Sequence, residues 1–353
     1  MSARLYRVAD DPVVDVLPPD YHGDPLMLNV LCTSLSGEEG PHFELLKDAG
    51  FECRVVSRDV DLRNETSFAA VLQGCHAVIA GAEPYTPELL SSCPNLRVIS
   101  RTGVGFDAID LAACDRHGVA VTITPGVNHD AVAEHAIALL MGIARGFPFA
   151  DQCVRDCAWS RQARPRVMGS TLGIVGLGRI GQAMATRGIG LGMNVIASDP
   201  YACVEFAQQH GVELLSLDQL YAWSDYISLH APVTDETNGM INARTIAKMK
   251  DSAVLINTAR GQLVNETDLC AALASGKLRG AGLDVFEVEP LPADSQLLKT
   301  ENVLLSNHIA GLDRESFHDM FSMAADTIIS LHGGRWPADR IVNLKGQTDW
   351  SWR

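Results

Sequence analysis

Three side chains that could do chemistry each stand just after a short apolar run. They are Arg260 in NTARG, Glu289 in LDVFEVEP and His308 in LLSNHIAG. An arginine can hold a carboxylate through two parallel charged hydrogen bonds, and a histidine can exchange a proton near neutral pH. A carboxylate beside that histidine can orient the imidazole and stabilise its protonated form. With the dinucleotide loop described next, these residues predict hydride transfer to or from a 2-oxo or 2-hydroxy acid.

The segment GLGRIG, from Gly176 to Gly181, matches the pattern GxGxxG. The pattern alone is common, so its context decides the interpretation. An apolar strand candidate, TLGIV, precedes it, and a helix-forming segment follows it. At such a turn the glycines let the backbone approach a pyrophosphate, and the free N–H groups of the helix start bind the phosphates. The loop therefore predicts a dinucleotide site.

An acidic residue after the next strand selects the dinucleotide. Asp199 directly follows NVIAS and stands 18 residues after Gly181, close to the spacing of about 20 that is typical of the acid on the adenosine ribose. A carboxylate there would repel a 2′-phosphate. Pro200 and Tyr201 follow, where NADP would need an arginine. The sequence therefore favours NAD.

Short apolar runs alternate with amphipathic stretches along the chain, which predicts an α/β fold with two Rossmann-like or flavodoxin-like domains, each with a parallel sheet. We expect an NAD-binding domain, residues 127–311, inserted into a substrate domain, residues 1–126 and 312–353. Long helices near 128–146 and 312–332 would connect the two. The substrate would bind in the cleft between the domains.

The composition excludes several partners. The 353 residues carry a formal net charge of −15, which disfavours a grip on nucleic acid or an anionic membrane. Residues 1–25 have no apolar core of the kind that a signal peptide needs, and we expect an arm before the first domain. The most apolar stretch, residues 131–144, is too short to span a bilayer.

Nine cysteines are scattered without a CxxC pair, which predicts a reducing, cytoplasmic location. Cys153 and Cys157 stand four apart, but no His or Asp ligand follows at metal spacing, and no metal site is expected.

GLGRIG, LHAPVTDETNGMI, LINTARGQLVNE, GLDVFEVEP and NHIAG, in this order, resemble the D-2-hydroxyacid dehydrogenase family and its phosphoglycerate dehydrogenase-like branch. The resemblance covers about residues 27–332. It implies that Arg260 binds the substrate carboxylate and polarises the reacting oxygen. It also implies that His308 is the general acid and base, with Glu289 as its partner. The histidines elsewhere are expected to be satisfied loop residues, namely His42, His76, His117, His210 and His318.

The same resemblance implies a set of cofactor contacts. Asp284 would bind the nicotinamide carboxamide, and the backbone of Ala310 and Gly311 would lie along the cofactor. His230 and Pro232 resemble a wall beside the nicotinamide ribose, although a buried strand-end histidine explains His230 as well. The full predicted set is Gly176, Gly178, Arg179, Ile180, Gly181, Asp199, His230, Pro232, Thr258, Ala259, Asp284, Ala310 and Gly311.

A glycine-rich turn in SRTGVGFDAID provides the predicted substrate contacts of the first domain. The resemblance implies that the N–H groups of Val104 and Gly105 bind the substrate carboxylate. Arg101 has two interpretations, contact with a substrate phosphate or a solvated charge at a strand end. Phosphoglycerate dehydrogenases usually carry a second arginine after the third strand, where this chain has Ala80 and Gly81. The phosphate site is therefore in question.

The family resemblance allows two functions and implies one oligomeric state. The first function is an NAD-dependent dehydrogenase that interconverts a D-2-hydroxy acid and a 2-oxo acid, with 3-phosphoglycerate as one candidate substrate. The alternative is an NAD(H)-sensing binding protein similar to the corepressors of the family. The helix at 128–146 resembles a dimer arm, so a homodimer is expected. The segment 159–166 could reach an active site or cover the surface.

Overall fold

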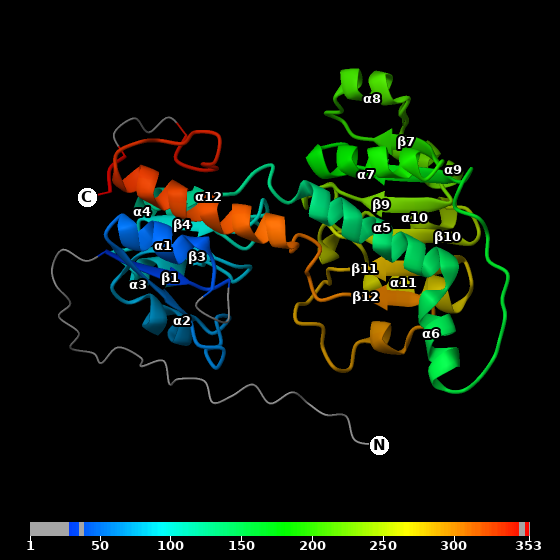
Figure 1. The fold of residues 1–353 in the computed structure, drawn as a ribbon, viewed down its shortest axis with the longest axis horizontal. Helices are drawn as coiled ribbons and strands as arrows, with labels where there is room; N and C mark the ends of the chain where they lie inside the picture. Colours follow the sequence, from blue (N-terminus) through cyan, green and yellow to red (C-terminus); the bar gives the residue numbers. More distant parts are fainter. Residues whose placement is uncertain (1–27, 35–38, 346–349, 353) are drawn as a thin grey trace. The chain divides into compact units, whose positions relative to one another are not determined.

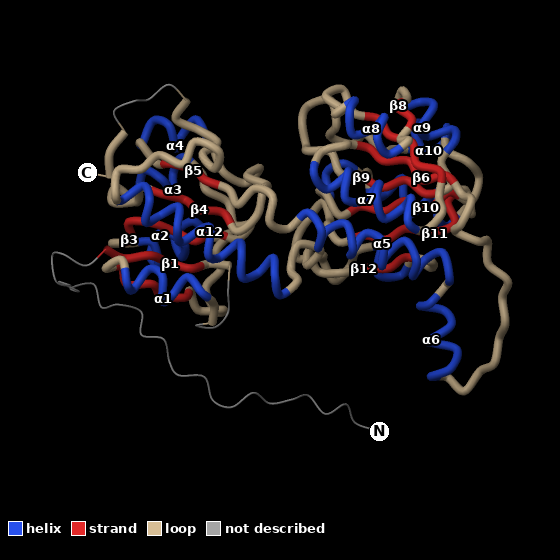
Figure 2. The backbone as a smooth tube through the Cα atoms, turned by 45° about the horizontal axis from the view of Figure 1, so that its top comes forward, coloured by secondary structure: helices blue, strands red, loops and turns tan. Residues whose placement is uncertain are grey.

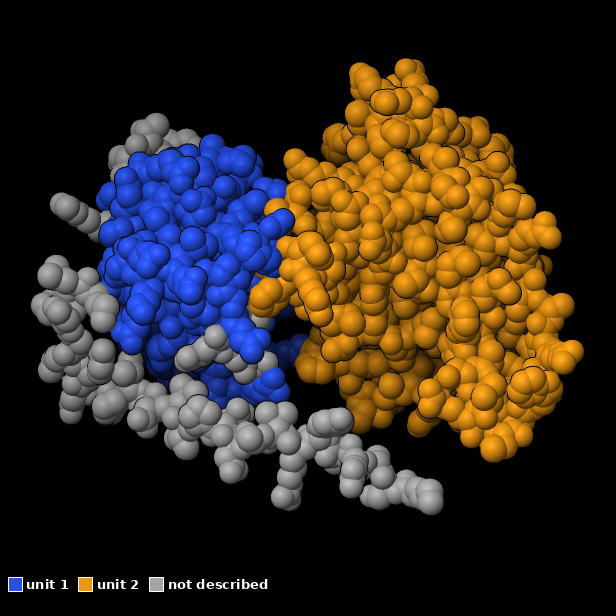
Figure 3. Space-filling model, viewed as in Figure 1, with its two compact units in different colours: residues 1–125, 318–353 blue, residues 126–317 orange. Residues whose placement is uncertain are grey.

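The computed structural model describes residues 28–34, 39–345 and 350–352, so the arm expected at residues 1–25 lies outside the described residues. The chain divides into two compact units (Figure 3). The first contains residues 1–125 and 318–353, and the second contains residues 126–317. The chain crosses back from the second unit to the first between residues 317 and 318, inside a continuous helix, α12 (Arg314–His332). The bounds expected from the sequence place this crossing at residue 312, before the helix.

The first unit is a five-stranded parallel sheet in the order β2-β1-β3-β4-β5, the flavodoxin-like order. Its helices connect consecutive strands, as parallel pairing requires (Figure 1). The elements are β1 (Leu28–Cys32), α1 (Pro41–Asp48), β2 (Phe51–Val55), α2 (Glu65–Leu72), β3 (Cys75–Ala80), α3 (Pro87–Ser92), β4 (Val98–Arg101), α4 (Leu111–His117) and β5 (Ala120–Thr122).

The core of this unit explains its layers. Leu31, Val78 and Ile99 of the sheet pack with buried residues of α2, α3 and α4. Helix α12 returns to the same unit, where its Ala324 carbonyl accepts a hydrogen bond from Ser100 of β4. Phe321 of α12 also contacts α1. From residue 318 onward, the C-terminal helix is therefore an integral part of the first unit.

The second unit is a seven-stranded parallel sheet in the order β12-β11-β10-β9-β6-β7-β8, the doubly wound order of dinucleotide-binding domains. Its elements are α5 (His129–Arg145), α6 (Phe147–Arg155), β6 (Thr171–Val175), α7 (Arg179–Gly190), β7 (Asn194–Ser198), α8 (Val204–His210), β8 (Glu213–Leu214), α9 (Leu217–Trp223), β9 (Tyr226–Leu229), α10 (Ala243–Lys248), β10 (Ala253–Asn257), η1 (Gly261–Leu263), α11 (Glu266–Ala274), β11 (Leu278–Leu283), η2 (Gln296–Lys299) and β12 (Val303–Leu305).

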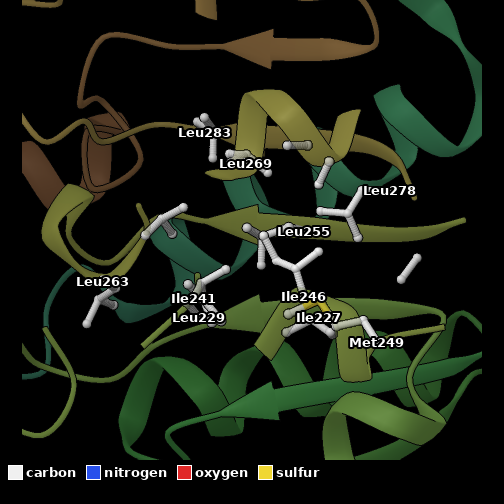
Figure 4. Packing of buried hydrophobic residues seen from close by; sticks show 14 of the residues in the cluster. Ile227, Leu229, Ile241, Ile246, Met249, Leu255, Leu263, Leu269, Leu278 and Leu283 are labelled. Carbon is white, nitrogen blue, oxygen red and sulfur yellow. The ribbon is translucent and has the colours of Figure 1, made fainter. Parts of the chain in front are cut away.

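Alternation along β10, an interior strand, builds a core on both faces of this sheet. Leu255 of β10 points into a cluster with residues of α9, α10 and α11 (Figure 4). Its neighbours Val254 and Ile256 point to the other face, toward α5, α7 and α8. The fold class predicted from the sequence is confirmed, and the carboxyl ends of the parallel strands gather at one edge of each sheet.

One helix of the second unit has no counterpart in the sequence-based prediction. After α5 the chain turns at Gly146, in the left-handed conformation, and forms α6 (Figure 2). None of the α6 residues is buried. Within the described residues, no single helix is both long and apolar enough to cross a bilayer. The α5–α6 pair, bent by 62°, passes that test of length and composition only when taken together.

The five histidines expected in loops, namely His42, His76, His117, His210 and His318, do not lie in loops. All five lie in helices or strands, and His42 of α1 is fully buried with neither ring nitrogen hydrogen-bonded among the described residues. Its burial lowers the pKa to about 4, so the ring is neutral at physiological pH. The apolar run around His42 gave no sign that the histidine itself would belong to the core.

Candidate functional site

Nδ1 of His308 and Oε2 of Glu289 are 2.7 Å apart, so the structure brings the predicted acid–base pair together. The other oxygen, Oε1, accepts a hydrogen bond from the Phe286 N–H at 3.0 Å. The His308 side chain is 42% exposed and that of Glu289 28%. The carboxylate is therefore held from both sides, and the imidazole remains accessible to a substrate.

The charges around Glu289 keep it ionised. Burial alone would raise the pKa of its carboxyl. The hydrogen bond and charge of His308, the Phe286 N–H and the charge of Arg260 outweigh that effect, so the net pKa lies below the ordinary value. Because an ionised carboxylate only accepts hydrogen bonds, Nδ1 of His308 carries a proton. Nε2 is then the ring nitrogen that can exchange a proton with a substrate.

A second carboxylate fixes the loop that carries His308. Asp284, which follows β11, is completely buried. Its Oδ1 accepts from the Ile309 N–H at 3.0 Å, and its Oδ2 accepts from the Ala310 N–H at 2.9 Å. The His308 N–H donates to the Asp284 backbone carbonyl at 2.8 Å. These bonds hold His308 at a φ of 56°, an uncommon conformation for a residue other than glycine.

Two residues that the sequence reasoning missed complete this network. The Ser306 hydroxyl donates to Asp284 Oδ1 at 2.6 Å. Nε2 of His135, on α5, lies 2.8 Å from the same hydroxyl and 3.5 Å from Asp284 Oδ1. The predicted role of Asp284 toward the nicotinamide stays a prediction, and its observed partners belong to the catalytic loop. His135 interrupts an apolar helical run, and that is the one signal that could have singled it out.

Arg260 reaches the same edge because of the glycine that follows it. A Cβ on Gly261 would lie 1.9 Å from the Phe286 backbone carbon, so only glycine lets the two loops touch. Asn257, buried at the end of β10, closes the turn by donating to the Arg260 carbonyl at 2.8 Å and accepting from the Ala259 N–H at 3.0 Å. Strand β10 therefore places Arg260 where Glu289 feels its charge.

The glycine loop has the geometry that a pyrophosphate needs. Gly176 has a φ of 92°, and a Cβ there would lie 2.7 Å from the His230 carbonyl. A Cβ on Gly181 would lie 2.0 Å from the Gly176 oxygen, so this glycine lets α7 pack tightly on the turn. A Cβ on Gly178 would meet no atom within 4 Å. The first helical turn, with Arg179 and Ile180, thus begins beside open space.

Asp199 stands at the end of β7, beside this loop. Its Oδ2 accepts from the Leu177 N–H and its Oδ1 from the Tyr201 N–H, both at 2.7 Å. The two bonds fix the carboxylate against the loop. Tyr201 itself is 93% exposed.

Two buried polar atoms fit a dinucleotide near the glycine loop. Nδ1 of His230 and Oγ1 of Thr258 are buried and have no hydrogen-bond partner among the residues that the structure describes. Nε2 of His230 pairs with the Ser228 hydroxyl at 2.8 Å, and burial lowers the pKa of this histidine to about 4. Unpaired buried polar atoms are costly, and a bound ligand with polar groups would satisfy them.

The remaining predicted cofactor residues follow strands of the same sheet. Pro232 is exposed after β9, Ala259 is partly exposed after β10, and Ala310 and Gly311 follow β12. Among the described residues, no group of three or more His, Cys, Asp or Glu side chains could hold a metal ion.

The predicted substrate contacts of the first unit lie at the carboxyl edge of its own sheet. Gly103, with a φ of 143°, follows β4, and its N–H donates to the Thr124 hydroxyl at 2.8 Å. Val104 is 37% exposed, and no hydrogen bond to a protein acceptor is formed by the Val104 or Gly105 N–H within the described ranges. Arg101 donates to the Gly105 carbonyl at 2.8 Å and to the Ala80 carbonyl at 3.2 Å.

The fold and the site define a Rossmann-type oxidoreductase with an acid–base histidine. Residues 137–310 match the model of the D-isomer specific 2-hydroxyacid dehydrogenase, NAD binding domain. The chain is 40% identical over 277 residues to the glyoxylate reductase of Korarchaeum cryptofilum, a match that covers 76% of this chain and 83% of that one. The chain belongs to the D-isomer specific 2-hydroxyacid dehydrogenase family, and it is an NAD-dependent oxidoreductase.

Two further similar proteins are named for different substrates. A D-3-phosphoglycerate dehydrogenase of Archaeoglobus fulgidus is 37% identical over 90% of this chain, and the match spans only 59% of that longer protein. The D-lactate dehydrogenase of Aquifex aeolicus, solved with NAD and lactic acid, superposes with a TM-score of 0.79 at 32% identity. That match covers 89% of this chain and 99% of that one. The matches give no support to the corepressor alternative.

Proposed function

We propose that this protein interconverts a small D-2-hydroxy acid and its 2-oxo acid by direct hydride transfer, with His308, Glu289 and Arg260 as the catalytic residues. The observation that carries the proposal is the 2.7 Å contact between His308 Nδ1 and an ionised Glu289. NAD, when bound, supplies the nicotinamide that accepts or donates the hydride. The protein supplies the proton, the binding of the carboxylate and the orientation.

The proton moves at one ring nitrogen. In reduction of the oxo acid, His308 Nε2 gives its proton to the oxygen that becomes the hydroxyl. In oxidation, the same nitrogen takes the proton from the hydroxyl as the hydride leaves the carbon. In both directions Glu289 keeps the proton on Nδ1 and stabilises the imidazolium when it forms. General acid–base help of this kind contributes about 10²- to 10⁴-fold to the rate.

The carboxylate of the substrate needs positive charge and N–H donors. Arg260 provides the charge and polarises the reacting oxygen, because its planar fork can bind two oxygens at once. The N–H groups of Val104 and Gly105 are proposed to bind the same carboxylate. The exposure of Val104, and the lack of a protein acceptor for either N–H group among the described residues, support this role.

The identity of the acid is the finer part of the proposal. Similar proteins are named for glyoxylate, 3-phosphoglycerate and lactate, and each of these acids is a candidate substrate here. In the structure Arg101 directs Nε and Nη1, two of the nitrogens that a phosphate would contact, to backbone carbonyls. This observation favours an unphosphorylated acid.

The test is the loss of NADH absorbance when the purified protein meets glyoxylate, hydroxypyruvate, 3-phosphohydroxypyruvate, pyruvate and a branched 2-oxo acid in parallel. We expect turnover with at least one of them. Binding of NADH without turnover of any acid in the panel would contradict the proposed reaction and would favour a sensing role.

A homodimer and a cytoplasmic location belong to the same proposal. Helix α6 exposes Phe147, Phe149 and Val154 at 63%, 41% and 61%, an apolar surface that a second copy of the chain would cover. Free thiols in the structure, among them those of Cys114 and Cys270, support a reducing compartment.

A further inference from the structure

A carboxylate lies at the point where the first sheet reverses its winding. The order β2-β1-β3-β4-β5 changes direction between β1 and β3, which are neighbours in the sheet (Figure 1). In open parallel sheets, ligands bind outside the carboxyl ends of the strands at such a switch point. Glu83 follows β3 by three residues. It is therefore placed where this unit would contact a ligand.

Packing around Gly81 locates the Glu83 carboxylate more closely. A Cβ on Gly81 would lie 2.8 Å from Glu83 Oε2 and 3.5 Å from the Cα of Ser34. Ser34 follows β1 and Gly81 follows β3, so the carboxylate occupies the space between the carboxyl ends of these two strands. The absence of a side chain at Gly81 leaves room for Glu83 to fold back over the sheet edge.

The carboxylate is held rigidly through one of its oxygens. Oε1 accepts hydrogen bonds from the Thr33 hydroxyl, from the Gly81 N–H at 3.1 Å and from the Tyr85 hydroxyl at 2.9 Å. The Tyr85 ring is buried and cannot move without disturbing the core. Oε2 makes no hydrogen bond within the part of the chain that the structure describes. One oxygen thus anchors the group and the other remains an acceptor.

The cation on the adjacent strand is directed at backbone carbonyls. Arg101, at the end of the adjacent strand β4, directs two of its donors to the carbonyls of Ala80 and Gly105. The positions just before Glu83 hold Gly81 and Ala82, which carry no charge. The carboxylate of Glu83 therefore lies over the carboxyl ends of β1 and β3, where it would face a group that binds at the switch point.

We propose that Glu83 is a specificity residue that makes this site one for 2-oxo acids with an uncharged far end. Its charge repels a phosphate or a second carboxylate on the substrate, and Oε2 accepts a hydrogen bond from a neutral donor such as a hydroxyl group. This inference rests on the proposed function, because it assumes that 2-oxo acids bind at the carboxyl edge of the first sheet.

The experiment compares kcat/KM for hydroxypyruvate and for 3-phosphohydroxypyruvate, which differ by the phosphate group. The wild type should prefer hydroxypyruvate. In Glu83→Gln, which keeps the shape and removes the charge, we expect the preference to fall at least about tenfold, because unit charges a few ångströms apart near a protein surface interact strongly. The matched control is Glu52→Gln, an exposed carboxylate near the amino end of β2. It should change the ratio less than about twofold, since surface charges at a distance are screened.

The outcomes separate this inference from the proposed function. An active Glu83→Gln enzyme with the wild-type ratio would overturn the role of Glu83 and leave the dehydrogenase proposal intact. A wild type that reduces no 2-oxo acid would overturn the dehydrogenase proposal instead. A purely structural role for Glu83 would lower both kcat/KM values together and leave their ratio unchanged.

A salt series with the wild type covers the case in which Glu83→Gln does not fold. Raising the ionic strength from about 0.01 M to about 0.3 M shortens the Debye length and weakens a repulsion between Glu83 and a phosphate. We expect the relative kcat/KM for 3-phosphohydroxypyruvate to rise over this range. A fall with salt, or a preference for the phosphorylated acid at low salt, would contradict the inference.

Discussion

Glu289 and His308 form a hydrogen bond of 2.7 Å, although they lie on two different loops, after β11 and after β12. Each partner has its own anchor: Glu289 accepts from the Phe286 N–H, and the His308 loop is tied to Asp284. The pair is therefore oriented before any substrate binds. Such preorganisation is what general acid–base catalysis requires.

The first prediction concerns the proton donor. His308→Ala should lower kcat by about 10²- to 10⁴-fold, because the proton would have to come from water. NADH affinity should remain within a few-fold of the wild type, since the glycine loop is untouched. His318→Ala, a histidine on α12 with a side chain 66% exposed, is the matched control and should keep full activity. Near-normal turnover of His308→Ala would remove this residue from the mechanism.

The second prediction follows from the lowered pKa of Glu289. A carboxyl group whose folded pKa is depressed contributes stability above its ordinary pKa of 4.5, and that contribution disappears as the pH falls through the folded value. At pH 7, Glu289→Gln should therefore lower the free energy of unfolding by about 1.5 kcal/mol, the lower end for a hydrogen bond to a charged group, because the pair is partly exposed.

Denaturant unfolding of the wild type and Glu289→Gln from pH 7 down to about pH 3 measures this difference. The two curves should approach one another as the pH falls below 4.5. A gap that stays constant or grows toward acid pH would show that the charge of Glu289 does not stabilise the fold.

The third prediction concerns the anchor of the catalytic loop. In Asp284→Asn, one acceptor becomes an NH₂ group that cannot accept from the N–H groups of Ile309 or Ala310. An unsatisfied buried donor costs about 1–3 kcal/mol, so unfolding should become easier by that amount and kcat should fall with it. Asp251→Asn, an aspartate with a side chain 92% exposed, is the control for the same chemical change. Unchanged stability and turnover in Asp284→Asn would contradict the positioning role.

The fourth prediction concerns the choice of dinucleotide. Asp199→Ala removes the carboxylate that would repel a 2′-phosphate, so the ratio of kcat/KM for NADH over NADPH should fall at least about tenfold. Glu205→Ala, in the first turn of α8, changes a nearby charge without touching the glycine loop and should leave the ratio within about twofold. An unaltered ratio in Asp199→Ala would rule out Asp199 as the selecting residue.

The fifth prediction concerns assembly. Phe147→Asp places a charge on the exposed apolar face of α6, and burial of an unpaired charge in an interface is strongly unfavourable. Sedimentation should find a dimer for the wild type and a monomer for the variant. Glu205→Ala provides a control here too, because it lies on a different helix. A wild type that sediments as a monomer at all concentrations would refute the dimer.

Much of this arrangement could be predicted from the sequence because it depends on local patterns. Apolar runs followed by a turn residue marked β6, β9, β10, β11 and β12, and the reactive side chains stood at the ends of the last three. Strand β8 was not predicted, since a two-residue strand has no periodicity to detect.

Contacts between distant segments could not be predicted in the same way. The family resemblance predicts Asp284 as a cofactor contact. Its bonds to Ile309 and Ala310 depend on the pairing of β11 with β12, which the sequence pattern does not show. The position of Glu83 could not be predicted, because its partners Thr33 and Tyr85 form no recognisable spacing pattern with it in the sequence. Burial of His42 depends on α12, which contacts it from more than 270 residues away in the chain.

The most direct test of the central claim follows the hydride itself. The protein should reduce the best 2-oxo acid of the panel other than glyoxylate, whose product is achiral, with NADH that carries deuterium at both hydrogen positions of the nicotinamide C4. The product should be analysed by chiral chromatography and mass spectrometry. We predict a D-2-hydroxy acid with deuterium at C2. An L or racemic product, or a product whose C2 hydrogen comes from water, would contradict a D-specific direct hydride transfer.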